Sequence, residues 1–134
     1  MTAITAPAPA LADLDRIVEL EPGRTAAAVR NVPSTLPLFD SHFPRFPVLP
    51  GVLILGSLGV LAGLLVSETV GGSWQLTAAR TVRYRHFVRP GDRMQLHVDL
   101  LEPGVCSGRV LVDGKRVTTV ARLELSAIGT GGAL

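Results

Sequence analysis

The sequence predicts an α+β fold in which a curved antiparallel sheet wraps around one long buried helix. Two observations lead to it: residues 52–66 are apolar on every side, and the segments on both sides of this run read as strands separated by tight turns. A helix that is apolar all round must be enclosed by other protein, and a curling sheet can enclose it. With 134 residues, of which 47% are hydrophobic, the chain can fill one such core but not two ordinary ones.

The segments before the helix predict a hairpin. Residues 15–21 end in the turn-forming pair Pro22-Gly23, and residues 25–32 alternate small apolar side chains until Pro33 stops them. The two segments are therefore expected to pair as antiparallel strands.

The helix is expected to begin at Pro50 and Gly51, because proline suits the first turn and glycine lets another group approach the backbone amides there. Further along, Gly56, Gly59 and Gly63 recur at helical spacing. Each glycine costs about 0.5–1 kcal/mol relative to alanine inside a helix. These glycines therefore predict close packing or room for a ligand along one stripe.

After the helix the sequence predicts an antiparallel meander. The pairs Gly71-Gly72 and Asp113-Gly114 and the segment Arg89-Pro90-Gly91-Asp92 mark breaks between strands. The pair Asp113-Gly114 is expected to join the final two strands as a hairpin. The strands are expected at 74–88, 94–101, 106–112 and 116–127.

Charge, cysteine content and hydropathy exclude several classes of function. The net charge of +2 gives little electrostatic support for a nucleic-acid partner. The single cysteine, Cys106, excludes an internal disulfide and fits a cytoplasmic protein, and it is expected to be a small packed side chain rather than a nucleophile. The apolar run of about fifteen residues is shorter than the roughly twenty that a membrane span needs, so no membrane role is expected.

The folded domain is expected at residues 14–128, between two tails. Residues 1–13 are rich in alanine, threonine and proline, and predict a disordered tail without an export signal. Residues 129–134 predict a flexible C-terminal tail. The histidines lack metal-ligand spacing and no glycine-rich phosphate loop follows a strand, so neither a metal nor a cofactor is expected.

The segment that leads into the helix holds the strongest candidate for chemistry, His42. Prolines at 44, 47 and 50 fix φ and disfavour a helical residue before them, so they predict a rigid loop that aims this imidazole. Backbone amides at a helix N-terminus, helped by the helix dipole, stabilise negative charge that develops in a reaction. The imidazole and the Gly51 amide together predict proton-transfer chemistry. By contrast, His86 and His97 are expected to be solvated side chains.

A motif around this histidine carries a resemblance to a known family. The stretch His42-Phe43-Pro44-x-x-Pro47-x-x-Pro50-Gly51-Val52-Leu53 resembles the signature of bacterial 3-hydroxyacyl-[acyl-carrier-protein] dehydratases, which have the hot-dog fold. Segments 15–23, 89–92 and 112–114 agree with this family in order and spacing. The resemblance implies a dimer with active sites at the subunit boundary, and a β-hydroxyacyl substrate carried on the phosphopantetheine arm of an acyl carrier protein.

The resemblance also implies roles for the residues that match. His42 is the base that removes the α-proton of the thioester, and the amide of Gly51 binds the thioester oxygen. The family's acid, which lies on the central helix of the neighbouring subunit and protonates the departing hydroxyl, falls on Gly56, and its usual glutamine falls on Val60. A positioned acid contributes a factor of about 10²–10⁴ in rate, so a homodimer is expected to be a poor dehydratase and a heterodimer with an acid-bearing relative a complete one. The implied substrate-binding residues are Phe43, Pro50, Val52, Gly56 and Val60.

Arginines gather on and beside the first strand after the helix. In this strand Val82 and Tyr84 are expected on one face, and Arg83 and Arg85 on the other. The arginines predict either a docking surface for an acidic carrier protein and its pantetheine phosphate or a solvated outer face. The expected docking residues are Arg45, Arg83, Arg85 and Arg89.

Other functions on the same fold stay open at this point. A hot-dog thioesterase or double-bond isomerase uses the same helix end to polarise a thioester, and isomerisation needs no acid for a leaving hydroxyl. A non-catalytic acyl-binding or scaffolding subunit would keep an apolar tunnel with His42 as a remnant. Neither the acyl chain length nor the pathway, fatty-acid or polyketide biosynthesis, follows from these residues.

Overall fold

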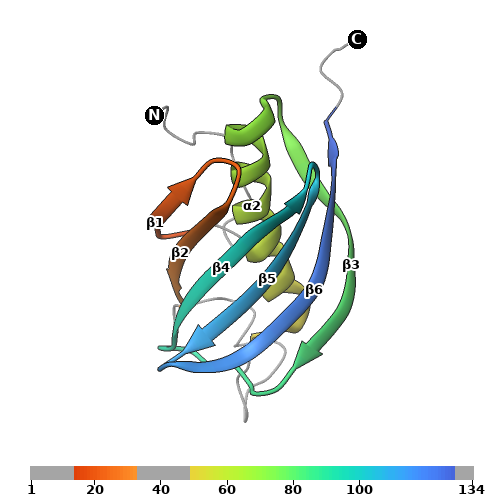
Figure 1. Cartoon of the computed structure of the whole chain (residues 1–134). Helices are drawn as coiled ribbons and strands as arrows, with labels where there is room; N and C mark the ends of the chain where they lie inside the picture. Colours follow the sequence, from red (N-terminus) through yellow and green to blue (C-terminus); the bar gives the residue numbers. More distant parts are fainter. Residues whose placement is uncertain (1–13, 33–48, 129–134) are drawn as a thin grey trace.

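A computed structural model describes residues 14–32 and 49–128 of the chain (Figure 1). The predicted tails, and the predicted loop with His42, Phe43 and Arg45, lie outside the described residues. The described elements are β1 (Arg16–Glu21), β2 (Thr25–Asn31), α2 (Gly51–Val70), β3 (Trp74–Tyr84), β4 (Arg93–Glu102), β5 (Val105–Val112) and β6 (Lys115–Ala127).

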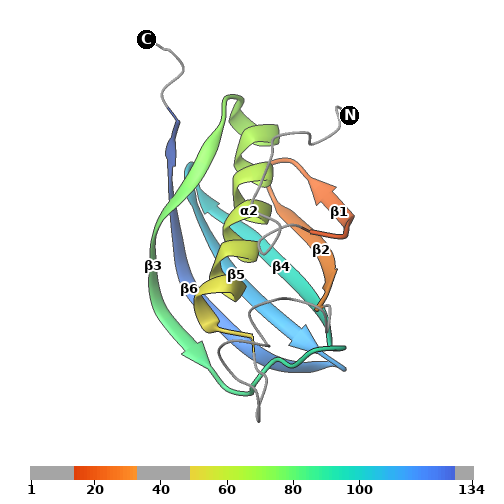
Figure 2. The ribbon, with the colours of Figure 1, turned by 180° about the vertical axis from the view of Figure 1, so that it is seen from behind.

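The strands form a single curved antiparallel sheet in the order β1-β2-β4-β5-β6-β3. Figure 2 shows α2 lying along the concave face of this sheet, with the strands behind it and around its sides. The predicted α+β architecture, the first hairpin and the breaks between strands are confirmed. The predicted meander is wrong for its first strand: β4, β5 and β6 pair in sequence order, but β3 pairs with β6 at the edge of the sheet and not with β4. Alternation and turn residues mark where strands begin and end, but they do not determine which strands become neighbours.

The core lies between α2 and the concave face of the sheet. Leu58, Leu61 and Leu65 of the helix are fully buried, as are Met94 and Leu96 of β4. Fully burying a leucine or methionine side chain contributes about 1.5–3 kcal/mol. Removal of apolar surface from water by these side chains is therefore the main force that holds the helix on the sheet.

Two glycines of α2 allow close approach of β3. A methyl group on Gly59 would lie 2.9 Å from the Cβ of Leu76, and one on Gly63 would lie 2.9 Å from the carbonyl oxygen of Trp74. Both distances are shorter than ordinary van der Waals contact. The sequence left close packing and room for a ligand open for this stripe, and at these two positions the structure shows close packing.

The predicted strand 74–88 is too long, because β3 ends at Tyr84. The amides of Arg85 and His86 both donate to the carbonyl of Val117, at 2.8 and 3.5 Å, so the regular ladder with β6 stops there. From this point the chain turns away towards β4.

The helix extends beyond the apolar run that predicted it. That run of about fifteen residues is shorter than a membrane span, whereas α2 has 20 residues and the length and composition of one. Half of this apolar stretch is buried inside the described fold. Packing against the sheet therefore accounts for its apolar composition.

Gly63→Ala should destabilise the fold. This is expected although alanine favours a helix over glycine by about 1 kcal/mol. The new methyl group would press on the Trp74 backbone, which cannot rotate away, and overpacking of this kind costs about 1–3 kcal/mol. Urea unfolding measures the change. Glu68→Ala, at an exposed position of the same helix, is the matched control and should change the free energy of unfolding by less than about 0.5 kcal/mol. An equally stable Gly63→Ala variant would show that the contact is looser than described.

Candidate active site

The start of α2 exposes backbone donors that no side chain of the described residues caps, and its first turn has no acidic residue. Pro50 precedes the helix, and its carbonyl accepts from the amides of Leu53 and Ile54 at 3.0 and 3.4 Å. The helix itself supplies no acceptor for the amides of Gly51 and Val52, as at every helix start. The positive end of the dipole is therefore left for an anion or a polarised carbonyl.

The ring of Tyr84, at the end of β3, lies against Gly51. A methyl group on Gly51 would lie 2.5 Å from Cζ and 2.8 Å from Oη of this tyrosine, so the ring can occupy its place only because residue 51 is glycine. The sequence predicted that Gly51 admits another group, and Tyr84 is such a group. From the sequence, Tyr84 was expected on one face of its strand and had no expected role at the helix start.

The direction of Tyr84 depends on a strained residue. Ala79 and Val82 both pack against the core, although residues three apart in a regular strand point to opposite faces. Between them Thr81 has a φ of 55°, a value that is rare for a β-branched residue and costs about 1–3 kcal/mol. This kink shifts the alternation, so that Val82 and Tyr84 face α2 and Arg83 faces outward.

The chain before α2 is tied to the same end of the molecule. The amide of Leu49 donates to Val88 at 2.6 Å, and the amide of Val32 donates to the carbonyl of Asp92 at 2.9 Å. The described residues on both sides of segment 33–48, which contains His42, are therefore held at the β3–β4 connection. That connection begins directly after Tyr84.

Gly56 and Val60 lie one and two turns beyond Val52 on α2, and both are half-buried. Beside them Ser57 is buried and accepts a hydrogen bond of 3.0 Å from the Arg30 guanidinium of β2. This bond crosses from the sheet to the helix one residue after Gly56, where the resemblance places the family's acid.

A cavity of about 440 Å³ is lined by Tyr84, whose ring touches Gly51, and by the segment that follows it. Its lining includes two predicted docking residues, Arg85 and Arg89, together with the exposed ring of Phe87. His86 was expected at the surface, and it is exposed and lines this cavity too. Arg83 lies outside the lining. The lining residues are Tyr84, Arg85, His86, Phe87 and Arg89.

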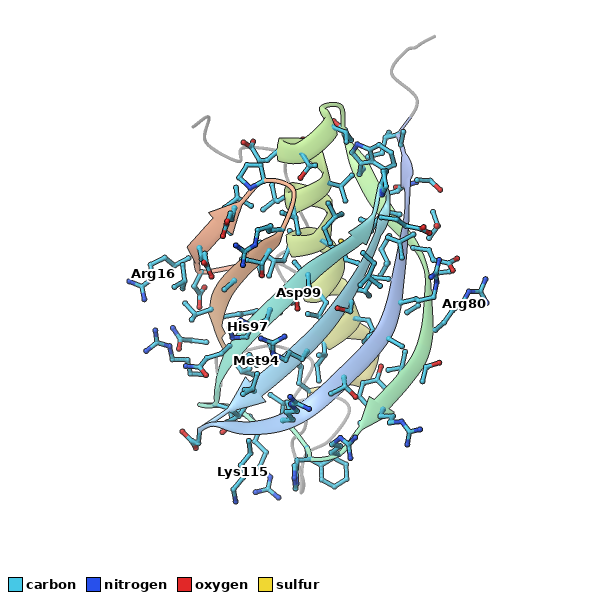
Figure 3. All side chains as sticks on the ribbon, in the orientation of Figure 1. Arg16, Arg80, Met94, His97, Asp99 and Lys115 are labelled. Atoms are coloured by element: carbon cyan, nitrogen blue, oxygen red, sulfur yellow. The ribbon has the colours of Figure 1, made fainter. Side chains whose placement is uncertain are left out.

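Two other candidates lie away from this end. His97 projects from β4 on the same face as Asp99, opposite α2 (Figure 3), and burial lowers its pKa. It was expected to be solvated, and it is half-buried. Cys106 is fully buried, and burial raises its pKa to about 11, so its thiol is a packed side chain as predicted. Within 14–32 and 49–128 no three His, Cys, Asp or Glu side chains gather as metal ligands.

Comparison with known proteins identifies the family. The sequence model of the FabA-like domain matches residues 6–121. The chain belongs to this family. It is 37% identical over 123 residues to the protein named "3-hydroxyacyl-[acyl-carrier-protein] dehydratase FabZ" of Syntrophotalea carbinolica, covering 86% of this chain and 82% of that one. It is 39% identical over 111 residues to the FabZ of Nitratidesulfovibrio vulgaris, covering 76% and 72%. The predicted relation to bacterial 3-hydroxyacyl-[acyl-carrier-protein] dehydratases is confirmed.

A solved structure shows the same fold. "The Dehydratase Heterocomplex ApeI:P from Xenorhabdus doucetiae" matches this FabA-like chain with a TM-score of 0.73 at 15% sequence identity. The match covers 92% of this chain and 88% of that one. The predicted hot-dog fold is therefore confirmed.

Thr81→Gly should stabilise the protein by about 1 kcal/mol, because glycine adopts a positive φ without strain and the relief exceeds the extra entropy of the unfolded chain. Thermal and urea unfolding measure the effect. Thr119→Gly on β6, where φ is not positive, is the matched control and should destabilise by about 0.5–1 kcal/mol. Equal destabilisation by both variants would mean that Thr81 is not strained.

Proposed function

We propose that this FabA-like chain is a subunit of a 3-hydroxyacyl-[acyl-carrier-protein] dehydratase, which removes water from carrier-bound 3-hydroxyacyl thioesters in fatty-acid or polyketide biosynthesis. The observation that carries the proposal is the uncapped start of α2 at Gly51, in a chain that retains the family's histidine and Pro-Gly motif. A polarising donor at this place suits a thioester carbonyl.

The proposed mechanism uses His42 and Gly51. The imidazole of His42 takes the proton from C2 of the substrate, and the electron pair moves towards the thioester oxygen. The Gly51 amide and the positive end of the α2 dipole stabilise the negative charge on that oxygen. The electrons then return to form the C2–C3 double bond, and the C3 hydroxyl leaves as water with a proton from an acid.

In this proposal the acid comes from a second subunit. Gly56 stands where the family has a carboxylate, so a dimer of identical chains has two bases and no acid. A related subunit with Glu or Asp at this position would complete one site with His42. Two observations support an assembly. First, β3 lies at an edge of the described sheet, where its outer backbone groups can pair with another chain. Second, the dehydratase ApeI:P, which shares the fold, is named as a heterocomplex.

The carrier protein is proposed to deliver its substrate past Arg85 and Arg89. These arginines line the cavity beside Tyr84, which in turn touches Gly51. A phosphopantetheine arm carries a phosphate that guanidinium groups bind well, and carrier proteins of this class are acidic. Arg83 and Arg45 are proposed to extend this surface.

Double-bond isomerisation is the second candidate. It moves a proton between carbons and expels no hydroxyl, so it does not need the acid that Gly56 lacks. A thioesterase and a non-catalytic acyl-binding subunit are the remaining alternatives. Assay of the products separates all of them. A cytoplasmic location is proposed from the single cysteine and the proposed carrier substrate.

Dehydration should be slow with the chain alone and should depend on His42. Incubation with a 3-hydroxyacyl carrier substrate, followed by mass spectrometry for the loss of one water, measures it. Gly56→Glu should raise the rate of the homodimer by about 10²–10⁴, the usual contribution of a positioned acid. Addition of an acid-bearing relative should have a similar effect. His42→Ala should abolish dehydration and leave acyl binding intact.

Two results would count against this proposal. Full activity of the unaltered homodimer would remove the need for a partner subunit. Release of free acid, or a shifted double bond without loss of water, would assign the chain to the thioesterases or the isomerases.

Charge reversal in the cavity should weaken use of the carrier-bound substrate. Arg85→Glu should raise KM for that substrate at least about tenfold, the equivalent of one charge-assisted hydrogen bond, and should spare a short pantetheine thioester without phosphate. Arg83→Glu reports whether the outer face takes part. Arg16→Glu on β1, at the opposite edge of the sheet from β3, is the control and should change KM for neither substrate. Equal effects of Arg85→Glu on both substrates would reject a docking role.

A further inference from the structure

The hydroxyl of Tyr84 and the amide of Gly51 are close enough to share one acceptor. Oη of Tyr84 lies 2.8 Å from the position of a methyl group on Gly51. Standard geometry puts the amide nitrogen about 2.5 Å from that same position, so the two donors are at most about 5.3 Å apart. One oxygen that accepts two hydrogen bonds of about 2.9 Å can join donors up to about 6 Å apart.

The surroundings of the phenol suit a hydrogen-bond donor. Tyr84 is about half exposed (49%) and lines the cavity, so a ligand can reach its hydroxyl. Partial burial raises the pKa of Tyr84 above its usual value, which keeps the proton on the phenol at neutral pH. No hydrogen bond from this hydroxyl to another described residue competes with a ligand.

The backbone on both sides of the contact is adapted to this placement of the ring. Gly51 leaves the space that the ring fills, and the positive φ of Thr81 turns Tyr84 rather than Arg83 towards α2. Without that kink the alternation of β3 would place Tyr84 on the opposite face. Two separate backbone features therefore converge on one phenol at the helix end.

We propose that Tyr84 is a second donor to the thioester oxygen, acting beside the Gly51 amide when the α-proton is removed. This inference rests on the proposed function of the site. The phenol gives no proton away in this step: it donates a hydrogen bond that strengthens as negative charge gathers on the oxygen. Tyr84 therefore contributes to catalysis of enolate formation, whichever subunit supplies the acid for the later loss of hydroxide.

Exchange of the substrate's α-proton in D₂O tests this role without the acid. A 3-hydroxyacyl pantetheine thioester is incubated with the full-length protein, and deuterium uptake at C2 is followed by mass spectrometry. Tyr84→Phe keeps the ring over Gly51 and removes only the hydroxyl, so the thermal midpoint should stay close to that of the unaltered chain. The exchange rate at saturating substrate should fall about 10²-fold, as for the loss of one oxyanion donor, with little change in KM.

Thr118→Val is the matched control. Thr118 pairs with Tyr84 on the neighbouring strand, and its buried hydroxyl has no hydrogen-bond partner among the described residues, so removing it should leave the exchange rate unchanged. Unaltered exchange in Tyr84→Phe would overturn the proposed donor and leave the dehydratase proposal standing. A Tyr84→Phe variant with normal exchange but slower dehydration would also overturn the proposed donor role, because the phenol would then act as the acid. If the unaltered chain neither exchanges nor dehydrates, alone or with an acid-bearing relative, the dehydratase proposal fails and the donor role fails with it.

Discussion

The contact between α2 and β3 is the constraint on which the rest of the structure depends. The two elements run in opposite directions and are joined by a tight turn, so the end of β3 meets the start of α2. Glycines on the helix permit the approach: Gly63 meets the Trp74 backbone near one end, and Gly51 meets Tyr84 at the other. A larger side chain at these positions would push the helix away from the strand. Close packing thus places a phenol at the uncapped helix end.

The same constraint organises the approach to the site. Directly after Tyr84 the chain leaves the ladder with β6, and the connection that follows carries Arg85 and Arg89 on the wall of a cavity. The backbone of that connection also holds Leu49, the residue before Pro50. One short segment therefore carries the cations, follows the phenol and fixes the entry into the helix. In the proposed function, contacts to a carrier's arm and contacts to the reacting thioester would therefore be made at one end of the fold.

Much of the fold was predictable from the sequence, and the predictions that were wrong or missing have physical causes. The order of strands and helix along the chain follows from periodicity and turn residues, and the family from the motif that contains His42. The pairing of β3 with β6 was missed, because a local pattern does not show that β3 crosses over to the far edge of the sheet. The contact of Tyr84 with Gly51 was missed because the two residues are 33 positions apart in the sequence, and no local pattern reveals it. The positive φ of Thr81 was equally invisible, because threonine normally avoids that conformation. Strand 74–88 was made too long because its alternation continues past the point where the backbone leaves the ladder.

The start of α2 lacks stabilising features that would interfere with the proposed chemistry. A serine, threonine or aspartate at the N-cap would stabilise α2 by about 1 kcal/mol, and an acidic residue in the first turn would add to this through the dipole. The chain has Pro50 at the cap and neither device among the described residues. An N-cap side chain would occupy the very amides that a substrate oxygen needs, and a carboxylate would cancel the positive end of the dipole. The strain at Thr81 is a second such cost near the same end. Both costs fit a helix end that is shaped for a ligand rather than for the stability of the free protein.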